Sequence, residues 1–317
     1  MYAVFMSKTV YYIVFVFVWL LSILPLWVLY RLSDGLYYII YYVARYRRRL
    51  VRKNLTASFP DKVESEIITI EKKFYSWLCD YFVETAKLAT MSEKQMKRRM
   101  RIEGLDIVNR YVEQGRGCAI YLGHYCNWEW VTSLPLWISE KAVCGQIYHV
   151  LENKYADKLM IDVRSRFGAT CIPMAETLRR IISYRNEGKA LVIGFIADQT
   201  PFWNNIHYWT KFLNHEKTPM FTGTERIIKK VDFAALYLDI RRERRGYYVA
   251  EFKLLTDTPQ KYVDYEITEI ATRALEKSIC RQPYLWLWTH NRWKRTYERW
   301  LEKMGTAVNN HKAENIR

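Results

Sequence analysis

The sequence contains none of the cysteine or histidine patterns that bind metals or form disulfide frameworks. Its six cysteines make no C-x-x-C pair and no zinc-finger spacing, and its six histidines are scattered along the chain. This pattern favours reduced thiols in a domain that faces the cytosol, and we expect neither a metal nor another cofactor. Because half of the 317 residues are apolar, the chain can bury a core that is stable without cross-links.

Internal repeats and long linkers are also absent. No stretch recurs at a fixed period, and no Gly/Ser/Pro-rich segment divides the chain, which has only 12 glycines and 8 prolines. Repeat architectures are therefore excluded. We expect a membrane anchor and interfacial segment over residues 1–44 and one catalytic domain over 45–304. A polar, flexible tail is expected over 305–317.

Acidic residues are scarce relative to basic ones. The 49 Lys and Arg against 33 Asp and Glu leave a net charge of +16, and such a surface attracts nucleic acid, anionic lipid headgroups or an acidic protein. The 25 Tyr, 13 Phe and 12 Trp fit either nucleic-acid stacking or a membrane interface. No recognisable nucleic-acid-binding module accompanies them, so we expect no nucleic-acid partner.

Residues 10–30 form an uncharged apolar run, VYYIVFVFVWLLSILPLWVLY. About 20 helical residues span a bilayer core of roughly 30 Å, so the run predicts an N-terminal membrane-anchoring helix. A cleaved signal peptide fits poorly because the run is long, Lys8 is the only basic residue before it, and no small-residue cleavage site follows. Pro25 can kink the helix or make the segment re-entrant, and a buried core helix is the alternative.

Basic residues follow this apolar run. The segment 36–43, LYYIIYYV, is too short to span a bilayer, and RYRRRLVRK at 45–53 then supplies six basic residues and no acid. Because basic residues concentrate on the cytoplasmic side of membrane proteins, the asymmetry predicts that the bulk of the chain is cytoplasmic. The basic cluster is either a solvated helix face or, as its position beside an anchor favours, a contact with anionic headgroups.

Beyond residue 60, short β-rich runs alternate with amphipathic stretches. Buried strands are predicted over 117–123, 190–197, 233–240 and 247–255. Helices are predicted over 61–90, 127–138, 153–167, 175–188, 223–231 and 264–280. This alternation predicts an α/β fold with a mixed, mostly parallel β-sheet flanked by helices.

The string YLGHYCNWEW at 121–130 carries the clearest chemical signal. It follows a predicted strand, and sites in open α/β sheets form at the carboxyl ends of strands. His124 and Glu129 do not share a face of one regular helix. They meet only if His124 lies in the loop before the helix and Glu129 in its first turns, with Gly123 permitting the sharp turn. A histidine held by a carboxylate is a general base, here for a hydroxyl that attacks a thioester; purely structural roles are the alternative.

Six blocks of the chain, taken in order, carry a family resemblance. They are RRRLVRKNLTASFPD (47–61), GHYCNWEW (123–130), VRSRFGATCI (163–172), IADQTP (196–201), FTGTERIIKK (221–230) and PYLWLWTHNRWKR (283–295). They resemble motifs of the lipid A late acyltransferases, the lauroyl/myristoyl transferase branch of the lysophospholipid acyltransferase superfamily. The family signature H-x-x-x-x-D/E is similar to the segment from His124 to Glu129, with Glu where many relatives carry Asp. Any single block is weak evidence for the family, but six blocks in the same order make a chance match improbable.

The resemblance implies roles for individual residues. His124 would be the base on the acceptor hydroxyl, and Glu129 its carboxylate partner. Residues expected to bind substrate are Arg164, Asp198, Gln199 and Arg292. The residues alone leave alternatives: a surface ion pair for Arg164, a cap or turn after a strand for Asp198, and a solvated basic face for Arg292.

The resemblance also implies the reaction. The chain would move a fatty acyl chain from acyl-carrier protein to a hydroxyl of a lipid A precursor at the bacterial inner membrane, without a covalent acyl-enzyme. The charge of +16 gives a physical reason for an acidic carrier protein as donor. The same chemistry on an aminolipid, a phosphoinositol mannoside or a lysophospholipid is the alternative. The intact His124 and Glu129 argue against two other classes, a membrane-tethered nucleic-acid-binding protein and a non-catalytic lipid-binding scaffold.

Overall fold

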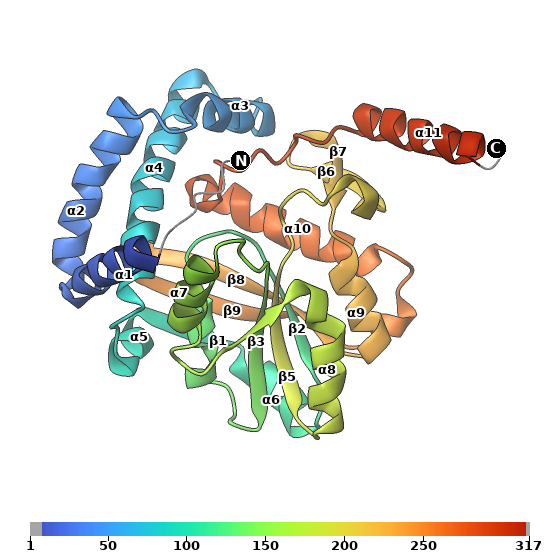
Figure 1. Ribbon diagram of the computed structural model, residues 1–317, viewed down its shortest axis with the longest axis horizontal. Helices are drawn as coiled ribbons and strands as arrows, with labels where there is room; N and C mark the ends of the chain where they lie inside the picture. Colours follow the sequence, from blue (N-terminus) through green and yellow to red (C-terminus); the bar gives the residue numbers. More distant parts are fainter. Residues whose placement is uncertain (1–7, 315–317) are drawn as a thin grey trace.

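A seven-stranded β-sheet forms the centre of the computed structural model, which describes residues 8–314 (Figure 1). Its strand order is β1-β9-β8-β2-β5-β3-β4. Strands β8 and β9 are antiparallel, and the other neighbouring pairs are parallel. The strands are β1 (Met100–Glu103), β2 (Cys118–Leu122), β3 (Ala142–Tyr148), β4 (Thr170–Pro173), β5 (Ala190–Ile196), β8 (Ala234–Arg244) and β9 (Tyr247–Thr256). The predicted mixed, mostly parallel sheet is confirmed.

Four of these strands, β2, β5, β8 and β9, coincide with the predicted ones because each is rich in apolar and β-branched or aromatic residues. The sequence patterns do not predict β1, β3 and β4. Strands β1 and β4 have four residues each, and β3 contains Gly145 and Gln146. These segments become strands because neighbouring strands supply backbone partners, as β5 and β4 do on the two sides of β3.

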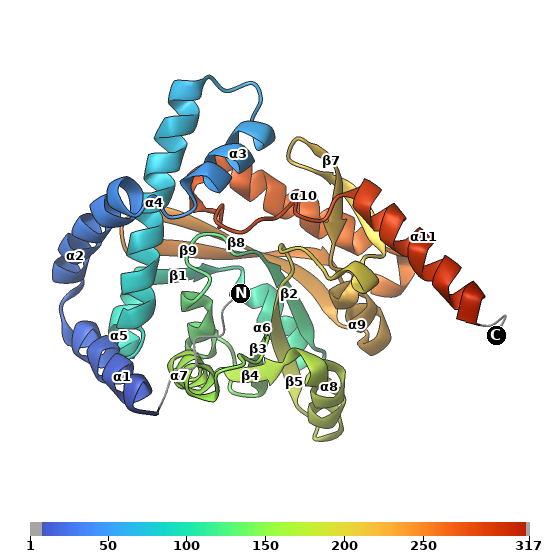
Figure 2. The same ribbon diagram turned by 45° about the horizontal axis from the view of Figure 1, so that its top comes forward.

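Helices flank the sheet. Figures 1 and 2 place α1, α2 and α4 along one edge of the molecule and α8, α9 and α11 along the other. The α-helices are α1 (Lys8–Ile23), α2 (Leu26–Tyr38), α3 (Arg48–Ser58), α4 (Glu64–Lys87), α5 (Glu93–Arg99), α6 (Leu105–Glu113), α7 (Lys154–Arg164), α8 (Thr177–Asn186), α9 (Gly223–Val231), α10 (Glu266–Arg281) and α11 (Tyr297–Glu314). Helices α4, α7, α8, α9 and α10 lie at predicted positions.

Smaller elements complete the fold. A π-helix, η1 (Ile39–Val43), connects α2 to the turn before α3. Two strands, β6 (Tyr208–Phe212) and β7 (His215–Met220), form a separate antiparallel hairpin. The 3-10 helices are η2 (Trp130–Leu136), η3 (Met174–Glu176), η4 (Trp203–Asn205), η5 (Pro259–Lys261) and η6 (Pro283–Leu285).

The N-terminal apolar run is divided between two helices. Helix α1 ends at Ile23 and α2 begins at Leu26, because Pro25 has no N–H to donate and its ring clashes with the preceding turn. The run at 10–30 therefore does not form the single helix that its length predicts. Within residues 8–314, no helix is both long and apolar enough to cross a bilayer.

The turn between α1 and α2 is fixed to α4. Lys87, buried near the end of α4, donates to the carbonyl oxygens of Ser22 (2.6 Å) and Leu24 (3.0 Å). On α2, the hydroxyl of Tyr30 donates to the buried carboxylate of Glu84 (2.8 Å). Helix α2 is therefore an integral part of the folded domain.

Two segments differ from their predicted local structure. The predicted α-helix over 127–138 is wrong, since this segment contains only a 3-10 helix with Pro135 inside it. Proline cannot donate to the α-helical ladder. At the C-terminus, α11 continues to Glu314, so most of the segment 305–317 is helical. Residues 1–7 of the predicted anchor and 315–317 of the predicted tail lie outside the described residues.

Candidate active site

His124 lies in the loop after β2, at the carboxyl end of the parallel strands. Its backbone N–H donates to Oδ2 of Asp198 (2.9 Å), and its Nδ1 lies 2.6 Å from Oδ1 of the same side chain. Gly123 permits this approach, because a Cβ there would lie 2.8 Å from Leu275 and 3.2 Å from Oδ2 of Asp198. Two hydrogen bonds to one carboxylate thus fix both the backbone and the ring of His124.

Asp198 is buried just beyond the end of β5 and accepts a third hydrogen bond, from Nε1 of Trp286 (2.7 Å). Burial alone would raise the pKa of this carboxyl. The charge of His124 and the hydrogen bonds from His124 and Trp286 outweigh that effect and lower the pKa to about 2. An ionised Asp198 favours the tautomer with the hydrogen on Nδ1 of His124. In that tautomer Nε2 of His124 carries a lone pair, which accepts a hydrogen bond from Nε2 of Gln199 (3.3 Å).

The carboxylate that contacts His124 is not the one predicted from the signature. The sequence assigns Glu129 as its partner, but Nδ1 of His124 is hydrogen-bonded to Asp198. Within the described part of the chain, no hydrogen bond joins His124 to Glu129. The sheet register explains the difference: Leu122 of β2 is paired with Ile196 of β5. Residues two positions beyond each, His124 and Asp198, therefore emerge side by side at the same edge of the sheet.

Glu129 instead forms an ion pair with Arg164, the last residue of α7. The guanidinium donates through Nε (2.8 Å) and Nη2 (2.5 Å) to the two carboxylate oxygens, and the hydroxyl of Tyr81 adds a third bond of 3.3 Å. The Glu129 and Arg164 side chains are 3% and 22% exposed. Burial tends to lower the pKa of Arg164, but the hydrogen bond and charge of Glu129 raise it. The bidentate geometry holds this cation in one orientation.

One cavity of about 250 Å³ brings four predicted site residues together: His124, Glu129, Arg164 and Gln199. The sheet supplies much of its apolar wall. Residues of β2 and β5 that line it are Ile120, Leu122, Val192, Gly194 and Ile196. Side chains of a strand alternate between its two faces. The lining residues occupy alternate positions on β2 and on β5, so the cavity lies on one face of the sheet.

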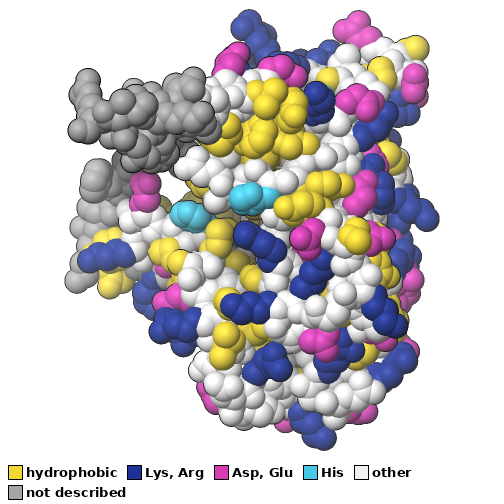
Figure 3. All heavy atoms as spheres, turned by 90° about the vertical axis from the view of Figure 1, so that its right-hand side faces the viewer, with side chains coloured by type: hydrophobic (Ala, Val, Ile, Leu, Met, Phe, Trp, Pro, Cys, Tyr) yellow, Lys and Arg dark blue, Asp and Glu magenta, His cyan; other side chains and the backbone are white. Residues whose placement is uncertain are grey.

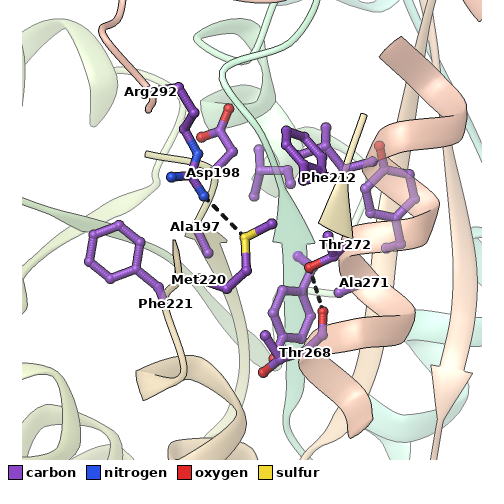
Figure 4. Close-up of a pocket in the computed structure, with 13 residues that line it drawn as sticks. Ala197, Asp198, Phe212, Met220, Phe221, Thr268, Ala271, Thr272 and Arg292 are labelled. Atoms are coloured by element: carbon purple, nitrogen blue, oxygen red, sulfur yellow. Dashed lines mark hydrogen bonds between the residues drawn. The ribbon is translucent and has the colours of Figure 1, made fainter. Parts of the chain in front are cut away.

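Arg292 lies beside Asp198, and both line a different cavity of about 30 Å³, to which β2 contributes Tyr121 and Leu122 (Figure 4). Its side chain is 1% exposed and donates to the carbonyl oxygen of Pro219 (2.5 Å). Burial lowers the pKa of this guanidinium to about 10, and the charge of Asp198 opposes that shift. The structure thus places Arg292 in the interior, on neither a solvated basic face nor the wall of the larger cavity.

Glu84 of α4 supports the signature loop, and the sequence analysis does not identify it. Its carboxylate accepts from Nδ2 of Asn127 (2.6 Å), and its carbonyl oxygen accepts from Nε1 of Trp130 (3.1 Å). Oδ1 of Asn127 in turn accepts the backbone N–H of Trp130 (3.1 Å). A signal was available: Glu84 follows Tyr81 by three residues on the apolar stripe of α4, where a charged side chain must face the interior.

Comparison with known proteins gives a consistent result. The sequence profile of the family described as "Bacterial lipid A biosynthesis acyltransferase" matches residues 4–295. The chain is 24% identical over 253 residues to the "Lipid A biosynthesis palmitoleoyltransferase" of Escherichia coli (strain K12), covering 78% of this chain and 79% of that protein. The "Lipid A biosynthesis acyltransferase" of Shigella flexneri matches with the same identity and coverage.

Proposed function

This chain belongs to the bacterial lipid A biosynthesis acyltransferase family, and from that membership we propose that it transfers a fatty acyl chain from acyl-carrier protein to a hydroxyl of a lipid A precursor. Membership makes the protein an acyltransferase. The observation that supports acyl transfer by general-base catalysis is the hydrogen bond between Nδ1 of His124 and Asp198, because it leaves the lone pair of His124 on Nε2. That atom lies at the wall of a largely apolar cavity, where the acceptor hydroxyl would take the place of the Gln199 amide.

His124 acts as the general base. Its Nε2 takes the proton of the acceptor hydroxyl while the hydroxyl oxygen bonds to the thioester carbonyl carbon. The C–S bond then breaks, the carbonyl reforms as an ester, and the proton passes from His124 to the departing thiolate. The negative charge of Asp198 stabilises the imidazolium between these two steps.

The acyl group passes directly from donor to acceptor, without an acyl-enzyme. The thiol within the signature, Cys126, has 0% exposure, and burial raises its pKa. A buried neutral thiol is a poor nucleophile. The position of Cys126 therefore supports direct transfer.

Glu129 stays in the catalytic centre, but with a task that differs from the predicted one. We assign to Arg164 the stabilisation of the oxyanion that develops on the thioester carbonyl, and to Glu129 the orientation of Arg164. Two observations support this: both residues line the cavity that contains His124, and the bidentate bond fixes the guanidinium before substrate arrives. Fixed donors of this kind stabilise charge that appears only in the transition state.

The membrane supplies the acceptor, and we propose that the protein lies on the cytoplasmic side of the bacterial inner membrane. The outward faces of α1 and α2 support this placement. They expose large apolar side chains to solvent, among them Ile13 (63%), Phe17 (61%) and Trp27 (70%). Exposed apolar surface beside basic residues is typical of proteins that rest on anionic bilayers.

Deleting the gene and weighing the lipids tests the acceptor. The expected result is lipid A that lacks one acyl chain, restored by the wild-type gene and not by a His124→Ala variant. If lipid A is unchanged and an aminolipid, phosphoinositol mannoside or lysophospholipid lacks an acyl chain instead, that lipid is the acceptor of the same reaction.

A further inference from the structure

A hollow of about 1040 Å³ beside α3 is separate from the cavity that contains His124. Its lining includes six basic residues and one acid, and we call it the arginine hollow. The basic residues are Arg45, Arg47, Arg48, Arg49, Arg52 and Lys53, and the acid is Glu71. The composition alone points to an anionic ligand.

The one acidic residue of the hollow, Glu71, is already hydrogen-bonded to arginines of the hollow. Glu71 is fully buried and accepts from Nε of Arg52 (2.5 Å) and Nε of Arg48 (3.4 Å). Arg49 and Lys53, one turn apart on α3, are exposed, and within residues 8–314 neither makes an ion pair. On the side of the molecule that Figure 3 shows, basic side chains are instead interspersed with acidic ones. A concave surface with excess positive charge concentrates anions.

The neighbouring surface indicates that this anion belongs to a lipid. Directly before the hollow, η1 exposes Ile39 (57%) and Val43 (77%), and the exposed aromatic rings of Tyr38 and Tyr42 stack beside them. Figures 1 and 2 show that α2 leads from this point toward α1 along the same edge. Aromatic and basic residues meet in this way at the headgroup level of a membrane, whereas a soluble anion would gain nothing from the apolar border.

The hollow is also connected to the catalytic loop. Nη1 of Arg47 donates to the carbonyl oxygen of Thr289 (2.8 Å). Two residues earlier, the N–H of Leu287 donates to the carbonyl oxygen of His124 (3.1 Å). Because two residues of chain span at most about 7 Å, the edge of the hollow lies a short distance from the loop that carries His124. This connection is consistent with one amphiphilic acceptor that occupies both places.

We propose that the arginine hollow binds a phosphate group on the headgroup of the acceptor lipid, while an acyl hydroxyl of the same lipid reaches His124. This inference rests on the proposed acyl transfer, which by itself assigns no headgroup site. Guanidinium groups suit the task because they form charge-assisted hydrogen bonds to phosphate oxygens. The phosphate of the acceptor, and not that of the bulk membrane lipid, is the ligand.

The test compares two double substitutions that remove the same charge. Arg49→Gln/Lys53→Gln removes two of the six positive charges of the hollow, and Arg226→Gln/Lys230→Gln removes two exposed charges at the same spacing on α9, on the other side of the molecule. Initial rates are measured in neutral detergent micelles with a phosphorylated lipid A precursor and with the same lipid after phosphatase treatment. Melting temperatures check that each variant is folded.

The hollow variant is expected to lose about 10- to 30-fold in kcat/KM with the phosphorylated acceptor, mainly through KM, because each basic residue contributes about one order of magnitude or less. With the dephosphorylated acceptor, the hollow variant and wild type should perform alike. The α9 variant should follow wild type on both acceptors. Equal losses of the hollow variant on the two acceptors, or no loss on either, would overturn the proposal.

Two further measurements separate the possible failures. If the hollow variant binds phosphatidylglycerol vesicles less well than wild type but discriminates between the two acceptors as wild type does, the hollow serves the bulk membrane and the proposal is wrong. If wild type transfers no acyl chain to either acceptor, the proposed function is wrong. Direct binding of the phosphorylated lipid to wild type and to the hollow variant then still tests the hollow. In that case, weaker binding of the phosphorylated lipid by the hollow variant supports the site, and equal binding overturns it.

Discussion

At the scale of single residues, the chemistry depends on which carboxylate holds His124. Asp198 accepts two hydrogen bonds from His124, and Glu129 accepts hydrogen bonds from Arg164. The two acids therefore have separable effects. Asp198 favours one tautomer of His124, the proposed base, whereas Glu129 holds the guanidinium of Arg164 in position.

Replacing His124 by Ala should lower kcat by about 10²–10⁴-fold, because general-base catalysis typically contributes that much. The variant should melt within a few degrees of wild type, since the side chain is partly exposed. Cys126→Ala is the control within the same loop and should keep most of the wild-type rate. A His124→Ala protein with more than half of the wild-type rate in a purified assay would contradict the assignment, as would burst kinetics from an acyl-enzyme.

The pH dependence of stability should report on Asp198. Its pKa is lowered from 3.8 to about 2 in the folded protein, so its stabilising effect is complete above its ordinary pKa and is lost as pH falls toward 2. Between pH 5 and pH 2, wild type should lose about 2 kcal/mol more unfolding free energy than Asp198→Asn. Denaturant titrations of both proteins at several pH values measure this difference. Parallel pH curves for the two proteins would exclude the strong coupling to His124.

At the scale of elements, the alternation of strand residues shapes the larger cavity. Gly194 on β5 lies between Val192 and Ile196, all three of which line that cavity. A Cβ at Gly194 would lie 3.5 Å from the nearest atom of Leu122, which is ordinary contact. A small side chain therefore fits at this position without moving the backbone.

Gly194→Ala and Gly194→Val should shift the donor preference toward shorter acyl chains, with the larger effect for Val, if the acyl chain lies in this cavity. Each methyl group occupies space that the end of a long chain would otherwise fill. Competition between short- and long-chain donors measures the preference, and the rate with the short donor serves as the internal control. An unchanged ratio in a folded, active Gly194→Val protein would place the acyl chain elsewhere.

Helices α1 and α2 contribute differently to membrane contact. Deleting residues 1–44 would remove Tyr30 from its bond to the buried Glu84, so such a truncation would disturb the fold as well as the membrane surface. The outward face of α1 can be changed without this effect, because its residues are exposed.

Ile13→Ser/Phe17→Ser should therefore move part of the protein from the membrane to the soluble fraction and leave the melting temperature unchanged. Burying an apolar side chain in the bilayer interface contributes about 1 kcal/mol or more. Val263→Ser/Leu301→Ser, at exposed apolar positions elsewhere, is the matched control and should stay with the membrane as wild type does. Equal fractionation of both variants would show that the face of α1 makes no membrane contact.

At the scale of the whole molecule, the net charge of +16 should determine the choice of donor. Acyl-carrier proteins are acidic, so a positive surface accelerates their encounter with the enzyme. Raising salt from 50 to 500 mM should lower kcat/KM for acyl-carrier protein several-fold, because the screening length then falls below about 5 Å. The same acyl chain on coenzyme A should be the poorer donor at low salt. Equal kcat/KM values for the two donors that do not change with salt would show that charge does not steer the choice of donor.

The sequence by itself determined the class of fold and the positions of the candidate site residues. Apolar runs predict β2, β5, β8 and β9, because a short apolar run between turn signals favours a buried strand whatever its neighbours. The signature and the IADQTP block place His124 and Asp198 at the ends of two such strands. These are local properties of the chain, so the sequence alone predicts them.

Only the tertiary structure decided which of these residues meet. The register of β2 against β5 brings Asp198 to His124, and the position of α7 brings Arg164 to Glu129. The burial of Arg292 likewise could not be predicted, because the sequence alone shows only a basic run near the C-terminus. Pairings between residues dozens of positions apart depend on strand order and helix packing, which are properties of the whole chain and not of any one segment.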